Sequence, residues 1–225
     1  QDLLLFVTKG VSFWADKARQ IGVKDKDVDV FVMQSLFTTV TNVNFDPETI
    51  MEWIQKGFEY RLRAARLYCE KIGYFDQKIP LAACWYEIPE TEFFAQKGYE
   101  FGILAEQNED LRSVKSLILF GLKGLAAYTD HAFILGYEDE SIFAFLHKAM
   151  SFLLKDDASI DDLVGLTLET GQVSVQAMAL LDKANTETYG KPEPTSVPTG
   201  LKSGPGIVVS GHDLLDLYEL LQQTE

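Results

Sequence analysis

The sequence is poor in the residues that most often bind metals or close disulfides. Its 225 residues include two cysteines, Cys69 and Cys84, and three histidines. Two cysteines provide neither a disulfide framework nor the paired spacing of a zinc or iron-sulfur site. We therefore expect Cys69 and Cys84 to be reduced, partly buried thiols, as is usual for a cytoplasmic protein.

Basic residues are also scarce. The chain has 20 lysines and arginines against 34 aspartates and glutamates, for a net charge of −14. This charge would repel phosphate backbones and anionic lipids, so we expect no nucleic acid and no membrane surface as a partner. No stretch reaches the ~18 uninterrupted apolar residues of a membrane span, because even residues 111–135 carry Arg112, Lys115, Lys123 and Asp130.

Short catalytic and targeting motifs are absent from the sequence. It has no Walker loop, no dinucleotide-binding glycine fingerprint, no G-x-S-x-G and no H-E-x-x-H. A di-iron carboxylate centre is excluded, because no glutamate stands three residues before a histidine. Residues 1–6 have no basic region ahead of their apolar run, so we expect no signal peptide and a location in the cytoplasm.

Apolar residues are abundant, at 47% of the chain, and they recur mostly at helical spacing. This pattern predicts a mainly α-helical fold, with Arg61, Arg63 and Arg66 on a solvated helix face. Gly171 is expected to divide the last long helical stretch into two helices. The predicted helical stretches are 2–20, 27–40, 47–72, 91–97, 108–135, 138–154 and 159–186.

Three of these helices have clear start signals. Asp46 can cap a helix in which Pro47, at the first position, sacrifices no hydrogen bond. Asn108 is a second good cap. Ser159 with Asp162 three residues later resembles a capping box.

The composition changes after the helical part. Residues 189–206 contain four of the seven prolines and several glycines, which is typical of a linker between domains. The run from Ile207 to Ser210 predicts a buried strand, and Asp213 can cap an amphipathic helix after it. We therefore expect a helical domain over 1–188, a linker over 189–206, and the first strand-helix unit of an α/β domain over 207–225. The other strands of that sheet would come from beyond Glu225 or from another chain.

The three histidines differ in their surroundings. His131 and His147 lie within apolar helices, where a core or half-exposed histidine is the common outcome, so neither is assigned a role. His212 follows a predicted strand and precedes a helix, which is where open α/β sheets place their ligands. The residues alone leave open whether His212 is a metal ligand, a general base or a loop residue.

Four stretches carry a resemblance to a known family, the hybrid-cluster proteins, also called prismane proteins or hydroxylamine reductases. The stretch over 115–128 contains Gly-Leu-Lys-Gly-Leu-Ala-Ala-Tyr, and that over 179–190 contains Ala-Leu-Leu-Asp-Lys-Ala-Asn-Thr. The stretch over 206–225 contains Val-Ser-Gly-His-Asp-Leu, and the chain starts with Gln-Asp-Leu-Leu. Because the second and third of these occur together and in order, the chain resembles this family along nearly its whole length.

The resemblance implies a helical domain of two three-helix bundles, followed by α/β domains that share an iron-sulfur-oxygen hybrid cluster. It implies that His212 binds an iron of that cluster, while the glutamate and cysteine ligands follow this segment in the parent protein. A four-cysteine motif for a 4Fe-4S cluster is expected just before Gln1. Cys69 and Cys84 match no ligand position, and no catalytic residue is assigned.

The activity that the resemblance implies is reduction of hydroxylamine to ammonia and water, or of nitric oxide. The implied partners are these small molecules, an electron-donor protein and the remaining part of the same polypeptide. The 225-residue chain alone is expected to hold no cluster and to be inactive. The alternative is a non-enzymatic helical interaction module that keeps the fold without clusters.

Overall fold

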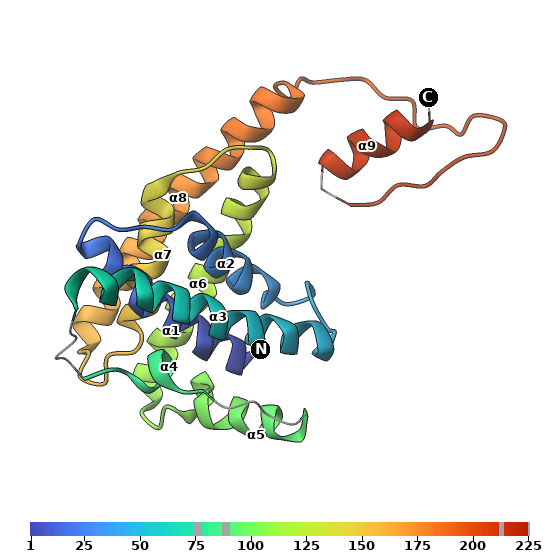
Figure 1. Ribbon diagram of the computed structural model, residues 1–225. Coiled ribbons are helices and arrows are strands. Elements are labelled where there is room, and N and C mark those ends of the chain that lie inside the picture. The colour runs from blue at the N-terminus through green and yellow to red at the C-terminus, as the bar shows by residue number, and fades with distance from the viewer. Residues whose placement is uncertain (74–77, 87–90, 212–213, 225) are drawn as a thin grey trace.

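The chain is built from helices, as the computed structural model shows (Figure 1). The structure describes residues 1–73, 78–86, 91–211 and 214–224, and within these ranges it contains no strand. The predicted mainly α-helical class is therefore confirmed. The helices are α1 (Asp2–Gln20), α2 (Lys26–Thr38), α3 (Pro47–Ile72), α4 (Leu81–Cys84), α5 (Thr91–Phe101), the 3-10 helix η1 (Ile103–Ala105), α6 (Glu109–Ile134), α7 (Glu140–Phe152), α8 (Ile160–Tyr189) and α9 (Leu214–Thr224).

The predicted start signals are confirmed by their hydrogen bonds. Asp46 accepts a bond of 3.1 Å from the backbone of Glu48 at the start of α3. Asn108 caps α6 through two backbone amides of its first turn. At α8 the Ser159 hydroxyl accepts from the Asp162 amide at 3.1 Å while the Asp162 carboxylate accepts from the Ser159 amide, a complete capping box. Each cap satisfies amides that the helix itself leaves without partners.

The expected break near Gly171 is wrong, because α8 is one continuous helix of 30 residues. A glycine inside a helix costs about 1 kcal/mol relative to alanine. Thr170 and Val173, on either side of Gly171, are buried against the rest of the protein. Tertiary packing along the whole length of the helix outweighs one unfavourable residue.

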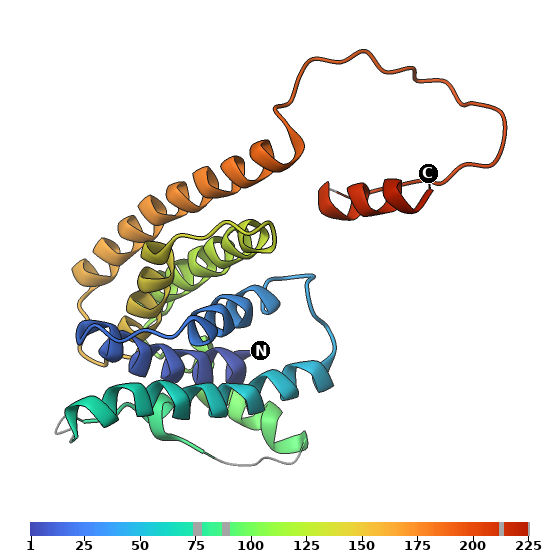
Figure 2. The ribbon, with the colours of Figure 1, turned by 45° about the horizontal axis from the view of Figure 1, so that its top comes forward.

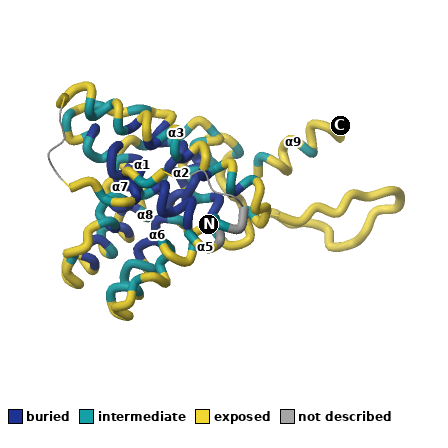
Figure 3. Tube along the Cα trace, turned by 60° about the horizontal axis from the view of Figure 1, so that its bottom comes forward, coloured by how far each residue is buried: buried dark blue, intermediate teal, exposed yellow. Residues whose placement is uncertain are grey.

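Helix α1 lies at the centre of the helical body, between α3 on one side and α7 on the other (Figure 2). Its buried residues point in nearly every direction, since a continuous run from Leu3 to Thr8 is buried. Buried residues of α1, α2, α3, α4, α6, α7 and α8 form the main core cluster, and a smaller one joins α1, α3 and α4. The buried residues are dark blue in Figure 3. The subdivision into two three-helix bundles therefore stays a prediction.

The short helix α4 packs tightly on α1. Gly10 allows this contact, because a Cβ added to it would lie 1.9 Å from the carbonyl oxygen of Ala82. The indole of Trp14 donates to the carbonyl of Ala83 at 3.0 Å. Arg61 of α3 donates to the carbonyls of Ala82 and Trp85. Arg61 is thus buried, and its expected place on a solvated face is wrong, because its guanidinium satisfies carbonyls that the short helix leaves free.

Helix α6 has the length and composition of a membrane-spanning helix, although its sequence carries charged residues that argued against one. In the structure 44% of its most apolar window is buried inside the protein. Core helices of globular proteins can have the same length and apolar composition, so these two properties are weak evidence for a membrane span. One side of α6 packs against α2 and α8.

The chain after α8 extends away from the helical body (Figures 1 and 2). Gly190 ends α8 with a φ of 89°, and residues 190–211 form no helix or strand. The helix of the expected strand-helix unit is present as α9. The expected strand is not, since Ile207 to Ser210 are exposed and lack neighbouring strands to pair with. The division into three segments stays a prediction.

Candidate functional site

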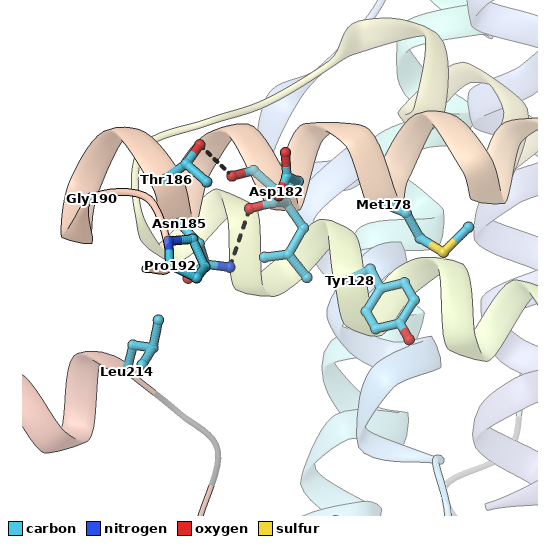
Figure 4. Close-up of a pocket in the computed structure, with 9 residues that line it drawn as sticks. Tyr128, Met178, Asp182, Asn185, Thr186, Gly190, Pro192 and Leu214 are labelled. Carbon is cyan, nitrogen blue, oxygen red and sulfur yellow. Dashed lines mark hydrogen bonds between the residues drawn. The ribbon is translucent and has the colours of Figure 1, made fainter. Parts of the chain in front are cut away.

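A cavity of about 330 Å³ lies where the C-terminal part of α8 meets α6 and the start of α9 (Figure 4). Its walls are mostly apolar, and the polar groups that reach it are a phenol, a carboxylate, an amide and a hydroxyl. The lining residues are Tyr128 of α6, Met178, Leu181, Asp182, Asn185 and Thr186 of α8, Gly190 and Pro192 after it, and Leu214 of α9.

Three of the stretches that carry the family resemblance meet at this cavity. Tyr128 ends the 115–128 stretch, Asn185 belongs to the 179–190 stretch, and Leu214 belongs to the 206–225 stretch. These residues lie far apart in the sequence, and only the fold brings them together. The cavity is therefore the candidate functional site of the described residues.

A second, larger cavity of about 700 Å³ is lined by several of the same residues. It shares Tyr128, Asn185 and Leu214 with the first and extends to the loop between α2 and α3. His131 also lines it, with its ring 5.5 Å from that of Phe37. The sequence assigned His131 no role, because a histidine within an apolar helix is usually a core or half-exposed residue.

The polar side chains of the first cavity are held by their own helix. The amide nitrogen of Asn185 donates to the carbonyl of Leu181 at 3.1 Å, and the hydroxyl of Thr186 donates to the carbonyl of Asp182 at 2.7 Å (Figure 4). Both side chains donate to a carbonyl of the preceding helical turn. These bonds fix the directions of the two side chains without a partner from another helix. Among the described residues, no side chain or amide donates to the side-chain oxygen of Asn185 or to the carboxylate of Asp182, so both can act as acceptors.

The electrostatic environment of the second cavity is acidic on the side of α9. Burial raises the pKa of Tyr189 above its ordinary value, and the carboxylates of Glu219 and Asp216 raise it further. The ring of Tyr189 lies 6.4 Å from that of Tyr218 in α9. Tyr189 thus stays a neutral phenol at the junction between the helical body and α9.

His212, the predicted site residue, and Asp213, the predicted cap, lie outside the described residues. The chain on either side of them is described. Gly211 has a φ of 147°, a value that favours glycine, and Leu214 lines both cavities. The role of His212 as a cluster ligand stays a prediction.

His147 is a core residue, as its sequence setting indicated. It is fully buried in α7, and its Nε2 atom lies 2.8 Å from a carboxylate oxygen of Asp29. Arg19 of α1 pairs with the same oxygen at 2.6 Å. This network links three helices and does not face either cavity.

The described residues do not form a metal centre by themselves. No group of three or more histidine, cysteine, aspartate or glutamate side chains gathers at one point within those ranges. Cys69 is a half-buried free thiol in α3, and Cys84 is an exposed one whose sulfur lies 3.6 Å from the carbonyl oxygen of Pro80. These donors do not fit an iron-sulfur cluster, which needs several thiolates at one place.

A helical domain followed by an exposed segment rich in proline and glycine is typical of a multidomain protein. Comparison with known proteins supports this class. A family model described as Prismane/CO dehydrogenase family matches residues 1–225. The chain belongs to that family.

Several curated relatives named hydroxylamine reductase match the whole chain. The protein of Thermosipho melanesiensis is 50% identical over 230 aligned positions, and that of Petrotoga mobilis is 48% identical over 231. The protein of Clostridium tetani is 44% identical over 248. In each case all of this chain is covered, but only 42%, 42% and 43% of the relative. The chain therefore spans well under half the length of the proteins it resembles.

Proposed function

We propose that this chain is the helical part of a longer iron-sulfur oxidoreductase that reduces hydroxylamine. The observation that carries the proposal is the identity of 44–50% over all 225 residues to proteins named hydroxylamine reductase. The reaction takes hydroxylamine, two electrons and two protons to ammonia and water. Nitric oxide is a second candidate substrate.

His212 is the residue of this chain that we assign to the hybrid cluster, as one imidazole ligand of an iron. An imidazole suits iron as a ligand, and the residue before His212, Gly211, has a backbone φ of 147° that favours glycine. The other ligands and the 4Fe-4S cluster belong to other parts of the longer protein. Because the described residues cannot hold a cluster, no reaction step is assigned to them.

The wall of the candidate site has a positioning role in this proposal. Leu214 follows His212 by two residues and lines the same two cavities as Tyr128 and Asn185. If the start of α9 docks on this wall, it would restrict the position of the segment before α9, which contains His212. An electron-donor protein is the proposed redox partner, and the cytoplasm is the proposed location.

The test compares the 225-residue chain with the longer protein that contains it, each purified without oxygen and assayed for hydroxylamine-dependent oxidation of a reduced dye. We expect turnover and iron in the longer protein, and neither in the 225-residue chain. A longer protein that carries iron but leaves hydroxylamine and nitric oxide unreduced would refute the proposed activity. The non-enzymatic module is disfavoured, because the stretch that contains His212 lies within the region matched to the reductases.

A further inference from the structure

The side of α6 and α8 that faces away from the core carries a long row of exposed apolar side chains, here named the α6–α8 apolar face. Phe120 is 62% exposed and Leu168 is 67% exposed, which is unusual for such large side chains. The face consists of Leu117 and Phe120 of α6 with Val164, Leu168, Val175 and Met178 of α8.

The two rows lie on the same side of the molecule. Helices α6 and α8 touch closely, since a Cβ added to Gly121 would lie 2.9 Å from a methyl carbon of Thr170. Residues 164, 168, 175 and 178 recur at helical spacing along one stripe of α8. At the end of the rows, Tyr128 of α6 and Met178 of α8 line the same cavity (Figure 4).

The face is also almost free of charge. Charged residues make up 24% of the chain, which carries a net charge of −14. From Leu163 to Leu181, however, α8 has a single charged residue, Glu169, and this one pairs with Lys148 of α7 at 2.5 Å. A solvent-facing stripe in such an acidic protein would be expected to carry several charges. Exclusion of charge over this length is typical of a surface buried against protein.

We propose that the α6–α8 apolar face is covered by the remaining part of the same polypeptide in the longer protein. The relatives have more than half of their length outside the matched region. The chain after Gly190 begins at the end of the face, and α9 brings its own exposed apolar side chains, including Leu217 and Leu221. A tethered segment reaches this face at a high effective concentration, which favours it over a second copy.

This inference rests on the proposal that the chain is part of a longer reductase, and it names the domain interface that such a protein would use. It can be tested by the accessibility of single thiols in the 225-residue chain and in the longer protein. Cys69 and Cys84 are first replaced by alanine in the 225-residue region. Val175→Cys or Leu168→Cys then places one thiol on the face, and Glu52→Cys places the control thiol on the exposed side of α3.

In the 225-residue chain, at a concentration where sedimentation shows a monomer, all three thiols should react with a maleimide at similar rates. In the longer protein the reaction rates of the thiols at 168 and 175 should fall at least about tenfold, because a buried thiol reacts only when the interface opens. The thiol at 52 should keep its rate. Any cysteines outside the 225-residue region are distinguished by peptide mapping of the labelled sites.

Equal rates at 168 and 175 in both proteins would overturn the inference. It would also be overturned if the longer protein remained reactive at both sites while dimerisation, or binding to phosphatidylcholine vesicles, protected them. Protection in a longer protein that fails to reduce hydroxylamine would uphold the interface and reject the proposed activity. A longer protein that reduces hydroxylamine at full rate while both thiols stay reactive would uphold the proposed activity and reject the interface.

Discussion

The Nε2 atom of His147 in α7 lies 2.8 Å from a carboxylate oxygen of Asp29 in α2, and both side chains are buried. Arg19 of α1 reaches the same carboxylate at 2.6 Å and also pairs with Glu140 at the start of α7. One buried carboxylate therefore holds three helices together. A charge in such a place is tolerated only when its partners offset the loss of water.

Replacing Asp29 should destabilise the chain strongly. Asp29→Ala leaves Arg19 without its buried partner, and breaking a buried pair from one side typically costs about 3 to 5 kcal/mol. Urea denaturation followed by circular dichroism would measure the loss. Lys24→Ala is a control, because its ion pair with Glu140 is exposed at 3.4 Å and should contribute less than about 1 kcal/mol. Equal effects of the two variants would contradict the assigned role of Asp29.

The contribution of Asp29 should depend on pH. Burial by itself would raise the pKa of Asp29, but the hydrogen bonds from His147 and Arg19 outweigh it and lower that pKa below the ordinary value. A lowered carboxyl pKa gives stability that is fully present above the unfolded value of about 4 and is lost as the pH falls through the folded value. The gap between wild type and Asp29→Ala should thus narrow below about pH 4. A constant gap from pH 7 to pH 3 would disprove this.

Asp130 should behave in the opposite way. Burial raises its pKa above the ordinary value, although a hydrogen bond of 3.2 Å from Gln34 acts against this. The charged form therefore costs stability once the pH rises above the unfolded pKa of about 4. Asp130→Asn keeps an acceptor for Gln34 and removes the charge, so it should raise the free energy of unfolding at pH 7 by up to about 1 kcal/mol. The gain should vanish near pH 3, which a pH series of denaturation curves would show.

Gly10 should not tolerate a side chain. Because a Cβ there would lie 1.9 Å from the backbone oxygen of Ala82, Gly10→Ala must push α4 away from α1, at a cost of about 3 kcal/mol. Gly165→Ala in α8 is the matched control, since beyond its chain neighbours and its own helix backbone no atom lies within 4 Å of its Cβ position. Alanine there should stabilise the chain by about 0.5 to 1 kcal/mol. Thermal denaturation should show a lower melting temperature for Gly10→Ala and a higher one for Gly165→Ala than for the wild type.

His212 is tested in the longer protein. His212→Ala should leave the helical domain folded and the 4Fe-4S cluster present, because neither depends on the segment before α9. Hydroxylamine reduction should fall steeply, and His212→Gln should not restore it, because an amide is a poor substitute for an imidazole ligand. The measurement is turnover and hybrid-cluster spectroscopy at equal iron content. Unchanged spectra with near-normal turnover would remove His212 from the site.

The sequence by itself determined the helical class and most helix starts. Asp46, Asn108 and Ser159 are local signals whose hydrogen bonds form within one turn, so no tertiary contact is needed to predict them. The resemblance along the chain was likewise readable from short motifs, and the comparisons confirm the family. The sequence alone did not predict that α8 continues through Gly171. The local cost of about 1 kcal/mol is offset by tertiary packing along the helix, which the sequence does not show.

Only the tertiary structure showed that Arg61 is buried and that Tyr128, Asn185 and Leu214 line one cavity. Helical spacing fixes which residues share a face but not which helix covers that face. The same limit applies to the α6–α8 apolar face, where the pattern of Val164, Leu168 and Val175 is that of an ordinary core stripe. The fold leaves this stripe exposed because the main core cluster covers the opposite side of α8, where Leu163, Leu166 and Val173 are buried.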